Sequence, residues 1–143
     1  MGEFGIGQAV PRTEDPRLLR GEGRFGDDFS PGREALGFFL RSPHAHARIL
    51  SLDTKQAKEM PGVLSIITGE DIEKLKLGQF PCMVIRQKRD GSVQQAPRRG
   101  LALGRVRFVG DPVAFITAET LNQAKDAAEC SMLILKFYQP LQN

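Results

Sequence analysis

Residues 112–130 hold the feature that most constrains the fold, an apolar run followed at once by a capped helix. The run from Pro112 to Ala118 carries apolar side chains on both alternating faces, which is typical of a strand inside a sheet. Thr120 and Gln123 have the spacing of a capping box, so a helix is predicted over 121–130. Small residues facing inward would let this helix lie close on the sheet. The inward stripe is predicted to hold Leu121, Ala124 and Ala128.

Short strands and short helices alternate along the rest of the chain. Apolar alternation predicts strands at 35–41, 48–52, 63–68, 106–108 and 132–138. Capping signals predict helices at 16–20, with Asp15 as the N-cap, at 54–60 and at 69–75. Phe39 lies on the opposite face from Phe38, so the strand at 35–41 is also predicted to be an inner strand. Alternating elements around one core predict an α/β or α+β fold with a mixed sheet. The length of 143 residues suits a single domain over 1–143.

Residues 79–104 differ from this pattern. The segment is polar, shows no helical period and carries Asp90-Gly91, a usual turn dipeptide of β-hairpins. We therefore expect a polar hairpin that protrudes from the domain. Residues 79–104 also contain most of a cluster of basic residues in which Asp90 is the sole acidic residue. The cluster consists of Arg86, Lys88, Arg89, Arg98 and Arg99, with Arg105 and Arg107 beyond them.

The basic cluster has three interpretations: a nucleic-acid surface, a solvated hairpin and a surface that docks onto a partner subunit. A nucleic-acid surface is disfavoured because only Phe80 and Phe108 flank the cluster as stacking aromatics. A solvated hairpin and a surface that docks onto an acidic partner subunit remain open, with nearly equal weight. For the docking interpretation the candidate residues are Arg86, Lys88, Arg89, Arg98 and Arg99.

No catalytic, cofactor-binding or metal-binding residue is assigned from the sequence. Residues 21–26 spell G-x-G-x-x-G, but a helix precedes them and an acidic turn follows, so the strand–turn–helix context of a dinucleotide site is missing. His44 and His46 lack a third ligand and are expected to have structural roles. Asp27 and Asp28 are adjacent and would point apart on an extended chain, so they indicate a solvated turn. The cysteines, Cys82 and Cys130, are expected to be free and buried.

Four ordered phrases carry a resemblance to a known family. They are Gly5-Ile-Gly-Gln8, Glu14–Gly21, Arg41-Ser-Pro-His-Ala-His-Ala-Arg-Ile49 and Arg105-Val-Arg-Phe-Val-Gly-Asp-Pro-Val-Ala-Phe115. Together they resemble the start of the large subunit of molybdenum hydroxylases, which include carbon monoxide dehydrogenases, aldehyde oxidases and xanthine dehydrogenases. The resemblance implies the α/β hammerhead domain of that family. Residues 130–139 depart from the family pattern because its acidic residues are missing there.

The resemblance also implies a function. The family uses a molybdopterin-type molybdenum cofactor, iron–sulfur clusters and flavin, and its cofactor-contacting residues lie in segments that follow this one. We therefore expect a non-catalytic N-terminal structural domain whose partners are the remaining cofactor-binding segments and the iron–sulfur and flavin subunits. This chain alone is not expected to be active. The alternative from another class is a free-standing protein-interaction module.

Two further expectations concern the state of the chain. No stretch approaches the ~20 apolar residues that span a bilayer, and the N-terminus lacks a secretory pattern, so a cytoplasmic protein without membrane contact is expected. Apolar surface that the cofactor segments would cover is expected to make the isolated chain self-associate.

Overall fold

The computed structural model describes residues 11–81, 84, 86–94 and 98–137. Contacts divide the chain into two compact units, Met1–Glu34 and Ala35–Asn143. The first contains helix α1 (Asp15–Leu19) and the 3-10 turn η1 (Gly26–Asp28). The helix begins one residue earlier than predicted, because Glu14 rather than Asp15 occupies the N-cap position. The expectation of one domain over 1–143 stays a prediction.

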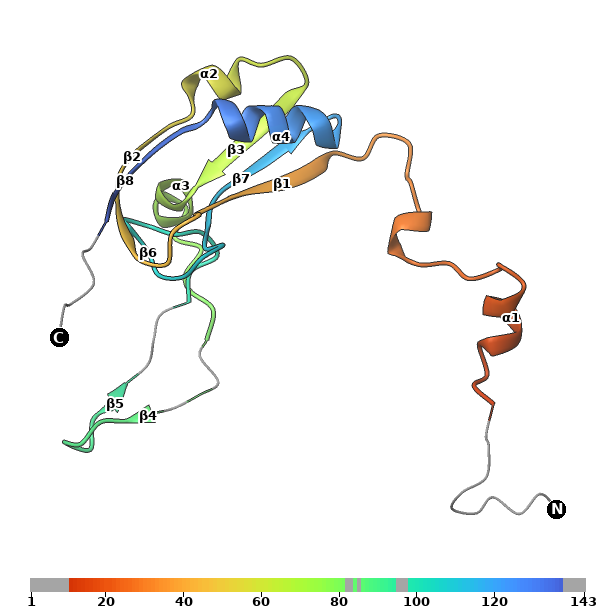
Figure 1. The fold of residues 1–143 in the computed structure, drawn as a ribbon, viewed down its shortest axis with the longest axis horizontal. Helices are drawn as coiled ribbons and strands as arrows, with labels where there is room; N and C mark the ends of the chain where they lie inside the picture. The colour runs from red at the N-terminus through yellow and green to blue at the C-terminus, as the bar shows by residue number, and fades with distance from the viewer. Residues whose placement is uncertain (1–10, 82–83, 85, 95–97, 138–143) are drawn as a thin grey trace. The chain divides into compact units, whose positions relative to one another are not determined.

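A three-stranded antiparallel sheet forms the centre of the second unit. Its order is β1 (Leu36–Arg41), β7 (Pro112–Ala118), β3 (Val63–Thr68), with β7 in the middle (Figure 1). Val113, Ala114, Ile116 and Ala118 of β7 are all buried, because the strand has a neighbour on each side and helix α4 (Leu121–Cys130) over one face. The inner position predicted for 112–118 is confirmed.

Strand β1 occupies an edge of this sheet, so its predicted inner position is wrong. Among the described residues it pairs with β7 alone. Its apolar residues on both faces have another cause. Phe38 packs toward the alanines of α4, while Phe39 on the opposite face contacts the ring of Phe115, with centroids 4.7 Å apart. Two apolar faces therefore reflect cover above and below the strand, and not a neighbour on each side.

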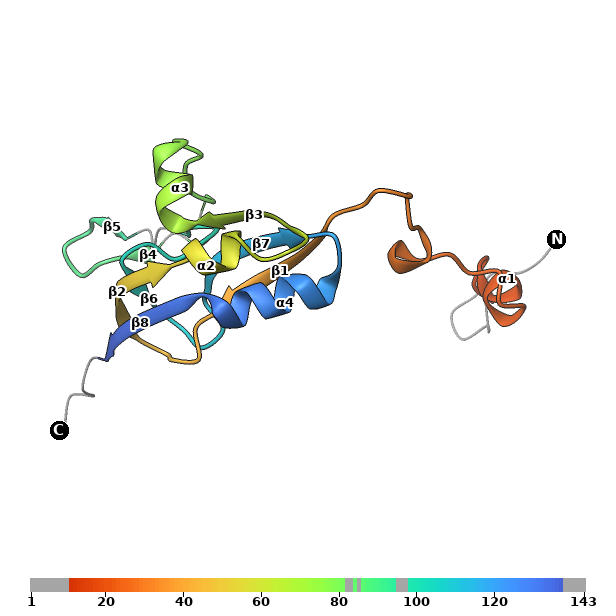
Figure 2. The same ribbon diagram turned by 90° about the horizontal axis from the view of Figure 1, so that it is seen from above.

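Helix α4 begins where the capping box predicted. The Thr120 hydroxyl accepts from the Gln123 backbone N–H at 3.3 Å, and Gln123 Oε1 accepts from the Thr120 N–H at 2.9 Å. The buried stripe differs from the prediction, since it consists of Ala124, Ala127 and Ala128 while Leu121 is 41% exposed. Contact with the sheet thus begins one turn later than expected, and alanines alone bring the helix onto β1 and β7 (Figure 2).

A second antiparallel sheet adjoins the first. Its order is β6 (Arg105–Val106), β2 (Ala47–Asp53), β8 (Met132–Phe137). A small core of Ala47, Ala102, Val106 and Val113 fills the space between this sheet and β7. The fold class is confirmed as α/β, and every ladder between the named strands of the described residues is antiparallel, which places it on the α+β side.

The connecting helices are short. Helix α2 (Lys55–Lys58) is shorter than the 54–60 predicted, and α3 (Gly69–Lys74) follows directly from β3. The Thr68–Asp71 capping box of α3 is confirmed, with Asp71 Oδ2 accepting from the Thr68 N–H at 2.9 Å. A Cβ at Gly69 would lie 2.3 Å from the carbonyl oxygen of Ala102. The start of α3 therefore rests directly on the backbone of residues 102–103.

A two-stranded hairpin lies within residues 79–104. Strands β4 (Arg86–Gln87) and β5 (Val93–Gln94) pair antiparallel around Asp90-Gly91, where Gly91 has φ +81°. Asp90 Oδ1 accepts from the Ser92 N–H at 2.9 Å, which closes the turn locally. The returning residues Leu101 and Ala102 are buried, so the chain rejoins the core before residue 104.

Candidate docking surface

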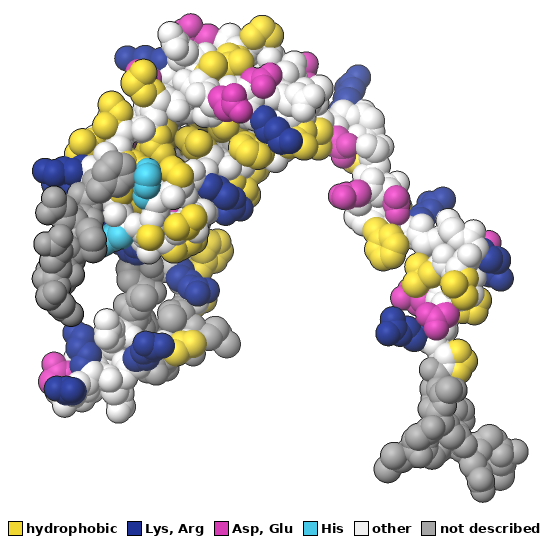
Figure 3. All heavy atoms as spheres, in the orientation of Figure 1, with side chains coloured by type: hydrophobic (Ala, Val, Ile, Leu, Met, Phe, Trp, Pro, Cys, Tyr) yellow, Lys and Arg dark blue, Asp and Glu magenta, His cyan; other side chains and the backbone are white. Residues whose placement is uncertain are grey.

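The five candidate docking residues fall into two groups. Arg86, Lys88 and Arg89 are exposed on the hairpin, and dark-blue basic side chains gather in that region of Figure 3. Arg98 and Arg99 lie at its base, where Arg98 forms a β-bridge with Phe80. The first group forms an exposed basic tip, whereas the second is built into the body of the domain.

Arg99 is already engaged within the chain. Its guanidinium donates to Glu73 of α3 in a short ion pair, and its side chain is 24% exposed. This pair compensates its charge in place. Arg98 forms no ion pair with another described residue, so it supplies the uncompensated charge at the base of the hairpin.

A cleft of about 370 Å³ opens beside these two arginines. Phe80 and Phe108 both contribute to it, although 28 positions separate them in the sequence, and each residue is more than half exposed. The sequence showed them only as flanking residues, and the fold brings them to one site. The cleft is lined by Phe80, Arg98, Arg99, Ala102, Arg107, Phe108, Asp111 and Pro112.

Buried Asp111 shapes one wall of the cleft. Its Oδ2 accepts from the Arg107 backbone N–H at 2.9 Å, and its backbone carbonyl accepts from the Ser42 N–H at 2.9 Å. Gly110 beside it has φ +85°, a left-handed conformation that glycine adopts freely. Sequence reasoning missed this role, although Gly110-Asp111-Pro112 was visible as a turn signal.

The charge of the cleft suits an anionic partner. Three guanidinium groups face one lining carboxylate, and Glu73 compensates one of the three. Among the described residues, a shifted pKa is found at Asp71 and Asp90, both outside the cleft. Hydrogen bonds from Thr68 lower the pKa of Asp71, which caps α3, and those from Ser92 lower the pKa of Asp90, which closes the hairpin turn. The cleft offers charge and aromatic surface for contact.

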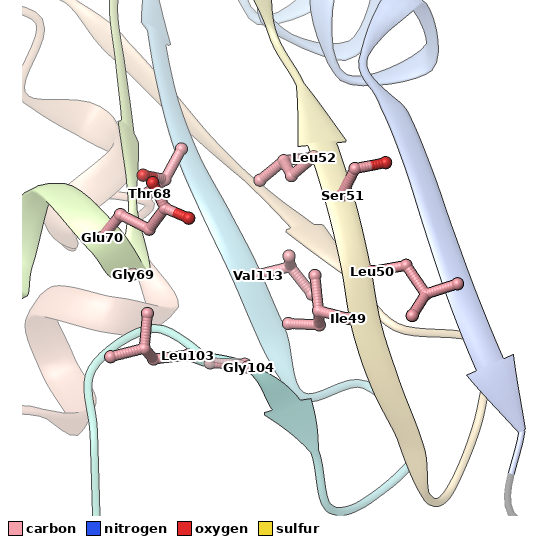
Figure 4. A pocket seen from close by; sticks show the side chains of 11 residues that line it. Ile49, Leu50, Ser51, Leu52, Thr68, Gly69, Glu70, Leu103, Gly104 and Val113 are labelled. Atoms are coloured by element: carbon pink, nitrogen blue, oxygen red, sulfur yellow. The ribbon is translucent and has the colours of Figure 1, made fainter.

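A second hollow of about 190 Å³ lies at the seam between the two sheets (Figure 4). Val113 of β7 and Ile49 of β2 extend toward each other across this seam, and Thr68 and Ser51 also line the hollow. Glu70 is its single ionisable lining residue among those described. Its composition is that of a packing seam between sheets.

The other sequence candidates are separated in the structure. Ser42 Oγ donates to the His44 carbonyl at 3.0 Å and accepts from the His44 N–H at 3.1 Å, which holds the backbone of the turn that contains the histidines. Asp28 lies in η1, where its Oδ2 accepts from the Phe25 N–H at 2.8 Å. The glycines at 21–26 follow a helix and lead into η1, so the strand–turn–helix context is missing from this described stretch.

Cys130 is free and exposed, so its predicted burial is wrong; it is the last residue of α4, past the buried alanine stripe. Cys82 lies outside the described residues.

Within the described ranges no three or more His, Cys, Asp or Glu side chains are grouped to hold a metal ion. None of the helices there has the length and apolar character to cross a bilayer.

A family model described as the a/b hammerhead domain of aldehyde oxidase and xanthine dehydrogenase matches residues 20–134. The chain belongs to this family. The hammerhead chain is 40% identical over 124 residues to the nicotine 6-hydroxylase large subunit of Paenarthrobacter nicotinovorans, covering 87% of this chain and 15% of that protein. It is 38% identical over 137 residues to the carbon monoxide dehydrogenase large chain of Afipia carboxidovorans, covering 96% of this chain and 15% of that one.

Solved structures agree with this assignment. Quinoline 2-oxidoreductase from Pseudomonas putida 86 superposes with a TM-score of 0.75 at 35% identity, over 94% of the hammerhead chain and 16% of that protein. A structure of Cu,Mo-CO dehydrogenase in the carbon monoxide reduced state superposes with a TM-score of 0.74 at 34% identity. The superposition covers 97% of this chain and 16% of the dehydrogenase chain. The hammerhead chain thus spans about 15% of the length of the curated relatives it matches, and these relatives are named as large subunits or chains.

Proposed function

We propose that this chain serves as the hammerhead domain of a molybdenum hydroxylase large subunit, where it supplies packing and docking surface and no reacting group. The supporting observation is the family match over 20–134 together with superposition on enzyme large chains at TM-scores of 0.74 and 0.75. Most of each relative's length has no counterpart in these 143 residues. We assign substrate oxidation to the segments of the large subunit that these 143 residues do not include.

The same proposal covers the cofactors and the location. The assembly would use a molybdopterin-type molybdenum cofactor, iron–sulfur clusters and flavin, and it would work in the cytoplasm. The donor sets on the described residues do not fit a metal, since no three ligating side chains are grouped there. We therefore assign none of this chain's residues to a step at molybdenum or at an iron–sulfur cluster.

For docking, we propose that the basic hairpin meets an acidic surface of a neighbouring segment or subunit. Arg86, Lys88 and Arg89 would meet it first, because exposed charge at a protruding tip accelerates and orients association. Arg98 would then lie beside Phe80 and Phe108 at the cleft, where contact can be dehydrated. The charge gradient from tip to base supports this order of contact.

A domain exchange tests the assignment. Residues 20–134 would replace the matching segment of the Afipia carboxidovorans carbon monoxide dehydrogenase large chain, and assembly and activity of the chimera would be measured. We expect a folded and assembled enzyme because the matched region is one structural unit of the family. The Hydrogenophaga pseudoflava large chain, 34% identical to this chain, supplies the control segment. Assembly of that control without assembly of the test chimera would contradict the proposal.

Analysis of the pure chain tests the non-catalytic part. We expect neither molybdenum nor pterin in stoichiometric amount after purification, and no oxidation of aldehydes, purines or carbon monoxide. Turnover by the 143-residue chain alone would overturn this part. Reading the coding sequence beyond residue 143 addresses the free-standing alternative, because a continuing or adjacent frame that encodes cofactor segments would exclude it.

A further inference from the structure

One edge of β1 offers backbone hydrogen-bonding groups that no strand of the described residues pairs. Within the described residues the strand pairs with β7 on one side and with no strand on the other. Its sequence, Leu-Gly-Phe-Phe-Leu-Arg, contains no proline and carries a charge at its last residue only. Natural sheets usually protect such an edge with charges, prolines, bulges or a covering segment. In β1 the register with β7 is irregular only between Leu40 and Arg41, so Leu36 to Leu40 form a regular edge. An open apolar edge is a template for pairing with another strand.

A groove of about 370 Å³ runs along this edge between β1 and helix α4. Lys125 and Glu129 of α4 are exposed on its wall, one helical turn apart, with buried Ala128 between them in the lining. Neither charge forms an ion pair with another described residue. The groove is lined by Phe38, Phe39, Leu40, Arg41, Lys125, Ala128 and Glu129.

A second β1 strand would fit this groove by its own sequence. If the β1 strands of two copies pair antiparallel, their two sheets join into one continuous sheet. Phe38 and Leu40 of the second copy then face the same side of that sheet as α4, as they do within one chain. An extended partner with apolar residues at alternate positions is what an edge and a groove of this kind require. The chain itself supplies that sequence.

The two α4 helices would then lie side by side and antiparallel. Helix α4 rests over β1 and β7 (Figures 1 and 2), so a two-fold axis at the β1 edge separates the helices by about two strand spacings, or about 10 Å. That is an ordinary helix-packing distance, and Ala128 leaves room for it. If the two-fold axis passes beside position 127 of α4, Lys125 of each copy lies opposite Glu129 of the other, and both charges gain a partner.

We propose that two copies of this chain associate through antiparallel pairing of their β1 edges, with reciprocal Lys125–Glu129 contacts between the α4 helices. This goes beyond the proposed function and does not depend on it. A contact of one short strand and one helix face is small, so we expect a weak dimer that forms at high protein concentration.

Charge reversal with rescue tests the pairing. K125E and E129K each place like charges at both symmetric contacts, so we expect either substitution to weaken the dimer about tenfold or more in sedimentation equilibrium. The double variant K125E/E129K restores opposite charges at both contacts, and its dissociation constant should return to within about threefold of the parent. D126K and K136E, exposed charge reversals outside the groove, serve as controls and should leave the constant unchanged.

Amide hydrogen exchange locates the contact. Outward-facing amides of β1 should exchange more slowly at millimolar than at micromolar protein, while those of the β4–β5 hairpin should not change. A monomer at millimolar concentration would overturn the proposal, and so would a dimer that ignores the charges at 125 and 129. Protection of β1 only after another protein is added would assign the edge to a different occupant and would equally refute the pairing of two copies.

Discussion

The β1–β7–β3 sheet and the β4–β5 hairpin are both antiparallel, yet different forces hold them. In the sheet, β7 is packed between two strands and under α4, and Ile116 is fully buried. In the hairpin, all four paired residues are exposed, and the turn is closed by Asp90 and Gly91. Burial stabilises the first, and local turn chemistry stabilises the second. The hairpin can therefore carry charge and change sequence without affecting the core.

The largest expected effect comes from truncating the core. I116A removes a fully buried side chain from the central strand and leaves a cavity, so we expect the free energy of unfolding to fall by about 2–5 kcal/mol. Urea unfolding followed by circular dichroism measures it. I134A, at a position 45% exposed on β8, is the matched control and should cost clearly less. Equal losses would mean that burial does not separate the two sites.

A close backbone contact gives the next largest effect. G69A introduces a Cβ 2.3 Å from the Ala102 carbonyl oxygen, so α3 or residues 102–103 must move. We expect a loss of about 1–3 kcal/mol in thermal or chemical unfolding. G32A, where a Cβ meets nothing within 4 Å and φ is not positive, is the control. Unchanged stability of G69A would show that this contact is loose.

A smaller effect depends on pH. Thr68 hydrogen bonds lower the pKa of Asp71, so its carboxylate stabilises the fold above the unfolded-state pKa, and that stabilisation is lost as pH falls through the lower folded pKa. D71N should therefore destabilise the protein at pH 7 and flatten the decline of stability between about pH 5 and 2. Unfolding midpoints across that range, with D126N as the exposed control, would measure it. An unchanged acid profile in D71N would contradict the assignment.

The smallest effect on global stability is expected in the hairpin. Gly91 has φ +81°, so G91V should disorder the turn and raise amide exchange in 86–94. The free energy of global unfolding should change by less than about 0.5 kcal/mol, because no core residue is lost. S92A, which removes one hydroxyl contact to Asp90, is the milder companion. A large global loss in G91V would make the hairpin part of the cooperative core.

Local signals predicted much of this fold, and long-range packing decided the rest. The β3 bounds and the capping boxes of α3 and α4 followed from sequence because their signals lie within a few residues of one another. Helix α2 did not follow in the same way, since its N-cap is Thr54 and makes no side-chain capping hydrogen bond. The edge position of β1 did not, since Phe39 is covered by Phe115, a residue 76 positions away (115 − 39). The cleft that Phe80 and Phe108 both line was not predicted either, because the hairpin separates the two residues in the sequence. The docking role of the five basic residues stays a prediction.

The ion pair between Arg99 and Glu73 anchors the base of the hairpin, so it affects how far the hairpin sequence can vary among homologues. It ties the segment returning from the hairpin to α3 across 26 positions, beside the Phe80–Arg98 bridge. Loop-closure entropy grows slowly, by about 0.6 kcal/mol for each doubling of length, once the two ends are anchored. Insertions and deletions between these anchor points should thus be tolerated, so the hairpin can diversify from one homologue to another while the frame that holds it keeps its geometry.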